Sequence, residues 1–162
     1  MRDFCSRRSI PMTVAVCLLF CCSAAPLFSA VKNWAVVTSA GSKLQDVPMA
    51  DLAKLCKGTQ KQWADGKPFT LVIHDPDSAE MRYAIEKLFG VEGADVKPLL
   101  AKLNETRQAV VIVDNDQELF RAVEAIPGAV GLVDVYSINS SVKVLRVDGK
   151  LPFDPGYALK GN

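Results

Sequence analysis

Short apolar segments that alternate with amphipathic ones constrain the fold of this chain most strongly. The apolar segments are rich in β-branched residues and are bounded by Gly, Pro, Asn, Asp or Ser, as is typical of buried strands. Strands that alternate with helices favour an α/β class, here a three-layer sandwich with a mixed, mainly parallel five-stranded sheet. The five strands are expected at residues 33–39, 69–74, 109–113, 129–133 and 142–147.

Four segments between these strands have apolar residues at three- and four-residue spacing, which predicts helices. Pro48 fits the first position of the first helix, and Gly58 fits the left-handed residue that ends it. Asp77 is predicted to cap the second helix, with Glu80 completing a capping box, and Gly90 is expected to end it. The other two helices are expected at residues 98–103 and between 115 and 126.

The first 30 residues differ from the rest in composition. Three arginines lie within the first eight residues, residues 12–28 are almost wholly apolar, and small residues follow. A basic start, a short apolar core and a small-residue exit are typical of a secretory signal peptide. We therefore expect a signal peptide at 1–30, a single domain at 31–150 and a C-terminal tail at 151–162, with the product in the periplasm or secreted. An uncleaved N-terminal anchor is the alternative.

Cleavage of this segment would leave Cys56 as the only cysteine, because the other four lie before residue 30. A lone cysteine cannot form an internal disulfide. Cys56 occupies an apolar position of the first predicted helix, whereas a reactive thiolate requires an electropositive, accessible setting. We therefore predict that Cys56 packs in the core.

The charge balance excludes two classes of partner. The whole chain carries 19 Lys and Arg and 18 Asp and Glu, and loss of the N-terminal segment would make the net charge about −1. Nucleic acids and anionic lipid surfaces are bound through concentrated positive charge. We expect neither a nucleic-acid partner nor membrane binding after signal cleavage.

Three common catalytic motifs do not occur in the chain. It has no G-x-S-x-G, no H-E-x-x-H and no Walker-type phosphate loop, and His74 is its only histidine. A pair formed by His74 and Ser78 would have no evident oxyanion hole or orienting group. We expect a protein that is not an enzyme and has neither a cofactor nor a bound metal.

Polar residues follow three of the predicted strands. The segments are TSAGS at 38–42, HDPDS at 74–78 and VDND at 113–116. Ligands of open α/β sheets bind beyond the carboxyl ends of the strands. The sequence therefore predicts a binding site that combines Ser39 of the first segment with residues of the second.

Five further segments carry a resemblance to a known family. They are LAKLCKG, QWADGK, VIHDPDSAEMRYAIEKLFG, AIPGAVGLV and KVLRVDGKLPF, in this order along residues 34–153. In order and spacing they resemble the phosphate-binding-protein-like family of type II periplasmic substrate-binding proteins. The family's usual fold is two α/β lobes that close on an anion. The resemblance implies that this chain forms one such lobe.

The resemblance also implies a site. In the family an arginine and a serine–glycine–threonine loop at a helix start contact the phosphate, and the matching positions here are His74, Ser78, Ala79 and Glu80. An imidazole replaces a permanently charged guanidinium, and Glu80 adds a negative charge where an anion would lie. We therefore predict a ligand-binding set of His74, Ser78, Ala79, Glu80 and Ser39 with weak or altered affinity for a small, phosphate-like oxyanion.

Two functional hypotheses remain open. In the first, the chain is an exported solute-binding module related to phosphate ABC transporters. In the second, it is a structural or interaction module whose open face, where a second lobe would dock, pairs with another copy or with another exported protein.

Overall fold

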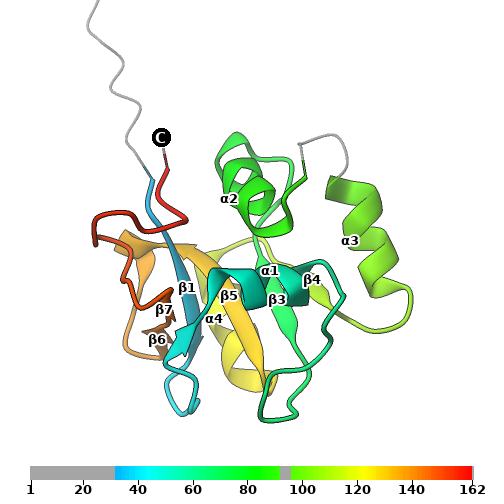
Figure 1. The fold of residues 1–162 in the computed structure, drawn as a ribbon, viewed down its shortest axis with the longest axis horizontal. Helices are drawn as coiled ribbons and strands as arrows, with labels where there is room; N and C mark the ends of the chain where they lie inside the picture. Colours follow the sequence, from blue (N-terminus) through cyan, green and yellow to red (C-terminus); the bar gives the residue numbers. More distant parts are fainter. Residues whose placement is uncertain (1–31, 92–95, 162) are drawn as a thin grey trace, which may run out of the picture.

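The computed structural model describes residues 32–91 and 96–161, so the predicted signal peptide lies outside the described residues (Figure 1). The strands and helices alternate as the sequence predicts. The strands are β1 (Trp34–Ser39), β2 (Asp46–Val47), β3 (Thr70–Ile73), β4 (Val110–Ile112), β5 (Ala129–Asp134), β6 (Val142–Val144) and β7 (Arg146–Val147). The helices are α1 (Met49–Cys56), α2 (Ala79–Phe89), α3 (Val96–Asn104), α4 (Asp116–Ala125) and a short 3₁₀ helix, η2 (Val135–Ser137).

Five strands form one mixed sheet in the order β4-β3-β5-β1-β6, and β2 pairs with β7 in a small second sheet. Strand β3 is parallel to both β4 and β5. Strand β1 is antiparallel to both of its neighbours, β5 and β6. Four strands of the main sheet therefore share one direction and β1 alone is reversed, which confirms the predicted mixed, mainly parallel sheet.

The sheet is buried on both faces, which gives three layers. Successive residues of β1 point to opposite sides, so that Trp34 and Val36 join the larger apolar cluster while Ala35 and Val37 join the smaller one. Residues of α1, α2 and α3 complete the larger cluster, and α4 covers the other face. Near-continuous apolar strands are the expected composition for a sheet covered on both sides.

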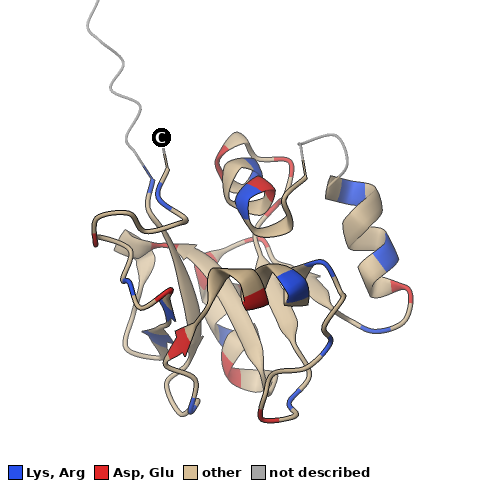
Figure 2. Ribbon diagram, viewed as in Figure 1, with Lys and Arg blue, Asp and Glu red and all other residues tan. Residues whose placement is uncertain are grey.

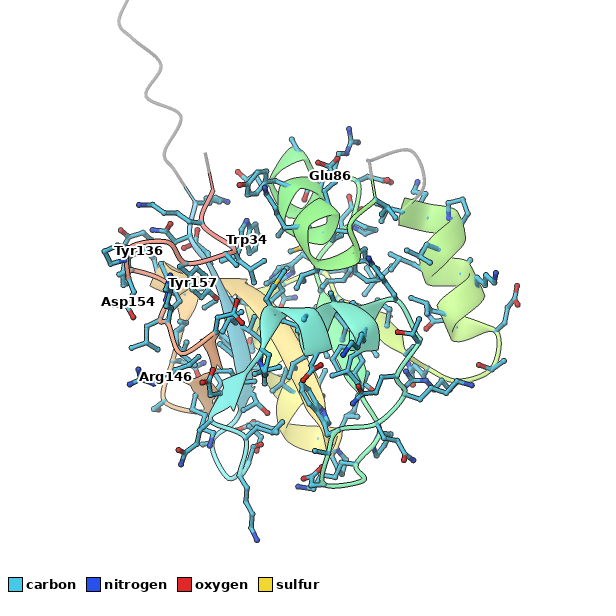
Figure 3. The ribbon with its side chains drawn as sticks, in the orientation of Figure 1. Trp34, Glu86, Tyr136, Arg146, Asp154 and Tyr157 are labelled. Atoms are coloured by element: carbon cyan, nitrogen blue, oxygen red, sulfur yellow. The ribbon has the colours of Figure 1, made fainter. Side chains whose placement is uncertain are left out.

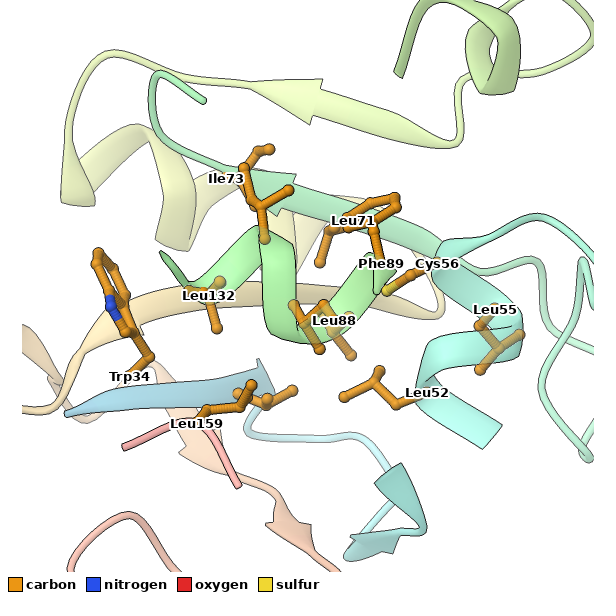
Figure 4. Packing of buried hydrophobic residues seen from close by; sticks show 14 of the residues in the cluster. Trp34, Leu52, Leu55, Cys56, Leu71, Ile73, Leu88, Phe89, Leu132 and Leu159 are labelled. Carbon is orange, nitrogen blue, oxygen red and sulfur yellow. The ribbon is translucent and has the colours of Figure 1, made fainter. Parts of the chain in front are cut away.

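The larger cluster also receives residues from the end of the described chain. Leu159 lies near Trp34 of β1 in Figure 4, and both Leu159 and Tyr157 are buried. Cys56 is 2% exposed and belongs to the same cluster, which confirms its predicted packing role. Burial raises the pKa of its thiol well above the ordinary value. The thiol is therefore protonated at neutral pH and unsuited to nucleophilic chemistry.

A tight turn before β5 joins distant segments at the amino edge of the sheet. Gly128 has a positive φ of 83°, and the Trp63 indole Nε1 donates a 2.7 Å hydrogen bond to the Gly128 carbonyl. Trp63 also packs edge-on against Phe69, with ring centroids 5.4 Å apart. These contacts fix the loop after α1 against the start of β5.

Candidate ligand-binding site

His74 and Asp116 form the centre of the candidate site. His74 directly follows β3, and Asp116 is the first residue of α4, just after β4. Because β3 and β4 are parallel neighbours, their carboxyl ends meet at one edge of the sheet. The His74 Nε2 atom lies 2.8 Å from Asp116 Oδ1, and the two side chains are 23% and 41% exposed. The imidazole is thus held in place by a carboxylate while part of it remains open to solvent.

The loop between His74 and α2 is organised by short-range hydrogen bonds. The backbone N–H of Asp77 donates to Asp75 Oδ1 at 3.0 Å. The Ser78 hydroxyl donates to the Asp75 carbonyl and accepts from the backbone N–H of Met81 at 3.2 Å, which makes Ser78 the N-cap of α2. The predicted cap at Asp77 with a capping box to Glu80 is therefore wrong. The hydrogen bond from the Asp77 N–H to Asp75 forms a turn before the helix, so the N-cap is Ser78, one residue later than predicted.

Two lysines lie against the acidic residues at this edge. Lys32 forms an ion pair with Glu80, and Lys97 Nζ lies 2.6 Å from Asp77 Oδ2. The Asp77 carboxylate raises the pKa of Lys97. These pairs are exposed to solvent, so they reduce the negative charge at the edge without abolishing it.

Ser39 lies at the opposite edge of the sheet, contrary to the prediction. Thr38 pairs with Val130 near the start of β5, so the carboxyl end of β1 meets the amino end of β5. In Figure 1 the loop after β1 is at the bottom and α2 is at the top. Ser39 lines a separate hollow of about 270 Å³ beside Gly128. The structure therefore brings His74, Ser78, Ala79 and Glu80 together and leaves Ser39 apart, because β1 is antiparallel.

A hollow of about 370 Å³ lies beside the loop that follows His74, although His74, Ser78, Ala79 and Glu80 do not line it. It lies between the loop after β3, helix α3 and strand β4. Asp75, Asp77 and Lys97 supply its charged lining, and Ile112, which is 54% exposed, supplies part of its apolar lining. A small solute would have room here, beside the loop at residues 75–77 that precedes α2.

Residues 32–91 and 96–161 contain neither a metal-ligand cluster nor a membrane-spanning helix. These residues bring no three His, Cys, Asp or Glu side chains together as metal ligands. Within the same ranges, no helix has the length and apolar character needed to cross a bilayer.

Comparison by sequence finds no matching family model. It does find the phosphate-binding protein PstS 2 of Streptococcus agalactiae, in serotype III and serotype V strains, at 32% identity over 79 residues. These residues make up 49% of this chain and 26% of the relative. The chain thus matches about a quarter of the length of these curated relatives.

Comparison by structure finds the same kind of protein. An ABC-type phosphate transport receptor from Vibrio cholerae superposes with a TM-score of 0.63 at 18% identity, over 81% of this chain and 54% of that one. PstS from Borrelia burgdorferi superposes with a TM-score of 0.59 at 19% identity, over 82% and 55%. Identities this low show a shared fold, which here spans about half of each neighbour.

Proposed function

We propose that this chain is an exported solute-binding module related to the PstS-like phosphate-binding proteins, in the form of a single lobe. We further propose that it has weak affinity for a small oxyanion. The observation that carries the proposal is that His74, which pairs with Asp116, and the loop that leads into α2 both follow the carboxyl end of β3. Ligands of open α/β sheets bind at this edge.

The start of α2 would supply most of the attraction for an anion. The first amides of a helix have no partner within it, and the helix dipole places partial positive charge there. The backbone N–H groups of Ala79 and Glu80 belong to this first turn. Ser78 caps the helix with its oxygen, so its hydroxyl would serve an anion only by giving up its bond to Asp75.

Two features would keep this affinity low. His74, the only histidine of the chain, is held by Asp116, and an imidazole carries a full charge only when protonated. The Glu80 carboxylate lies on the first turn of α2, where it repels an anion even though Lys32 partly compensates it. The chain would therefore bind phosphate as a weak ligand rather than as a tightly held cargo.

Isothermal titration calorimetry with phosphate and sulfate tests this proposal. We expect dissociation constants near the millimolar range, about 4 kcal/mol of binding free energy. Glu80→Gln should strengthen phosphate binding about threefold, because it removes a like charge from a partly screened surface. Glu124→Gln is the matched control, since Glu124 lies at the opposite edge and lines the hollow of Ser39. Submicromolar binding by the wild type, or equal effects of the two substitutions, would contradict the proposal.

A pair of exposed aromatic rings favours the second functional hypothesis, an interaction module. Tyr136 and Phe153 are 81% and 64% exposed, with ring centroids 6.1 Å apart. Tyr136 lies in η2, directly after the carboxyl end of β5 and away from the body of the sheet in Figure 3. Exposed aromatic residues at the edge where the candidate site lies are suited to contact a second copy or another exported protein.

Light scattering over a wide concentration range distinguishes this hypothesis. If the aromatic pair mediates association, the apparent mass should rise with concentration, and a Tyr136→Ser, Phe153→Ser double variant should remain monomeric. Tyr83→Ser is the control for loss of an aromatic ring elsewhere, because Tyr83 lies on α2 and is not part of the Tyr136–Phe153 pair. A monomeric wild type at high concentration would exclude self-association through this pair.

A further inference from the structure

A basic hollow lies on the far side of the molecule from His74. It has a volume of about 230 Å³, and its charged lining consists of Lys57, Lys61, Lys102 and Arg107. Lys57 and Lys61 follow α1, whereas Lys102 and Arg107 come from the end of α3 and the loop after it. Figure 2 shows basic positions on α3 and on the loops after α1 and α3. Arg107 contacts Phe69, just before β3, which places the hollow at the amino ends of β3 and β4.

Within the described part of the chain, no carboxylate lines the hollow beside these four positive charges. Among the described residues, the ion pairs of the protein use other lysines and His74, and none involves these four side chains. Like charges around a shared concave surface raise the local positive potential and attract anions.

The ends of the nearby helices account for only two of these four side chains, because Lys102 lies in the last turn of α3 and Lys57 lies beside Gly90, the C-cap of α2. Lysines often lie near helix C-termini, where they pair with free carbonyl groups. At the end of α1, however, the Lys54 carbonyl accepts from Gln60 N and the Thr59 hydroxyl, and the Leu55 carbonyl accepts from Gly58 N. Lys61 lies beyond this end, and Arg107 lies in a loop. The convergence of four cations therefore exceeds what capping requires.

Arg107 gives the hollow a fixed positive charge. Its Nη1 atom donates to the Phe69 carbonyl, which orients the guanidinium against the start of β3. Its Nη2 atom is buried and has no hydrogen-bond partner among the described residues. Burial lowers the pKa of Arg107, and a buried charged donor without a partner is unfavourable. An anion in the hollow would offset the charge of the guanidinium, even without a hydrogen bond to Nη2.

We propose that this hollow is a second anion site that takes a compact polyanion, such as a short chain of phosphate groups. Several cations around a small volume favour a ligand with several closely spaced charges over one with a single charge. Thr106 also lines the hollow and adds a hydroxyl donor. This site lies at the opposite end of β3 from the candidate site at His74, and the proposal does not depend on oxyanion binding there.

Calorimetry of the purified protein with inorganic tripolyphosphate tests this site. The Lys61→Gln, Lys102→Gln double variant should weaken tripolyphosphate binding about tenfold, or ~1.4 kcal/mol. Lys43→Gln, Lys87→Gln is the matched control, because neither residue lines the hollow, and it should bind as the wild type does. Binding should weaken with added salt. Circular dichroism should show that both variants keep the native fold, as expected for substitutions of exposed side chains.

Three results would overturn the proposal. The first is that the wild type fails to bind tripolyphosphate at 1 mM, the concentration that corresponds to a binding free energy of about −4 kcal/mol. The second is that both double variants weaken binding equally, and the third is that orthophosphate binds more tightly than tripolyphosphate. The Glu80→Gln variant separates this site from the one at His74. It should leave tripolyphosphate binding unchanged while it strengthens phosphate binding, so failure at either site would leave the other result interpretable.

Discussion

Replacing Gly128 with alanine is expected to lower the free energy of unfolding by ~3 kcal/mol or more. The positive φ of 83° at this position is unfavourable by roughly 1–2 kcal/mol for a residue with a Cβ atom. In addition, a Cβ atom would lie 2.3 Å from the backbone oxygen of Pro68. Backbone cannot rotate away as a side chain can, so the turn before β5 would have to shift, with a further penalty of about 1–3 kcal/mol.

Gly66→Ala is the matched control for this substitution. Gly66 has nearly the same φ, 82°, but a Cβ atom there would meet nothing within 4 Å. The Gly66→Ala variant should therefore lose only the free energy of unfolding that comes from the backbone preference, roughly 1–2 kcal/mol. Urea denaturation of the two variants measures the difference. Equal losses would show that the contact with Pro68 is relieved without strain.

Replacing Phe89 with alanine is expected to destabilise the fold by about 3–5 kcal/mol, the range for truncation of a buried phenylalanine. Phe89 is the last residue of α2 and is fully buried. Figure 4 shows its ring among the residues of the larger cluster, near Leu71 and Cys56. Truncation would remove apolar contacts with β3 and α1 and leave a cavity that close-packed neighbours fill only in part.

Phe153→Ala provides the corresponding surface substitution. Phe153 is 64% exposed and contacts Tyr136. Its truncation should change the free energy of unfolding by about 0.5 kcal/mol or less. Chemical denaturation of both variants under identical conditions gives the comparison. A loss below about 1 kcal/mol for Phe89→Ala would mean that α2 is not held to the sheet by this cluster.

The local elements of the fold could be predicted from sequence, but the direction of β1 could not. Apolar periodicity indicates the helices and strands, and Gly90 correctly predicts the end of α2. A strand followed by a helix and another strand favours a parallel pair, yet β5 lies between β1 and β3 and β1 is reversed. That arrangement depends on contacts between residues almost 100 positions apart, which local pattern does not encode. The wrong placement of Ser39 follows from this single reversal.

The centre of the candidate site was only half recognised from sequence. His74 was predicted as a site residue, whereas Asp116 was not. A signal for Asp116 was present, because VDND at 113–116 follows the strand that pairs with the strand of His74. The basic hollow offered no comparable signal, since Lys61 and Lys102 are 41 positions apart and neither forms part of a motif. Only the packing of α3 beside the loop after α1 brings them together.

The position of β1 within the sheet has a consequence for folding during synthesis. A ribosome or translocase delivers β1 early, but both of its sheet partners, β5 and β6, come from residues 129–144. Five of its six residues are buried in the folded state. A nascent chain would therefore carry an apolar, unpaired strand that is prone to aggregate until residues 129–144 emerge. Its non-local pairing should make folding slow, and protection of this strand by a chaperone would limit aggregation in the interval.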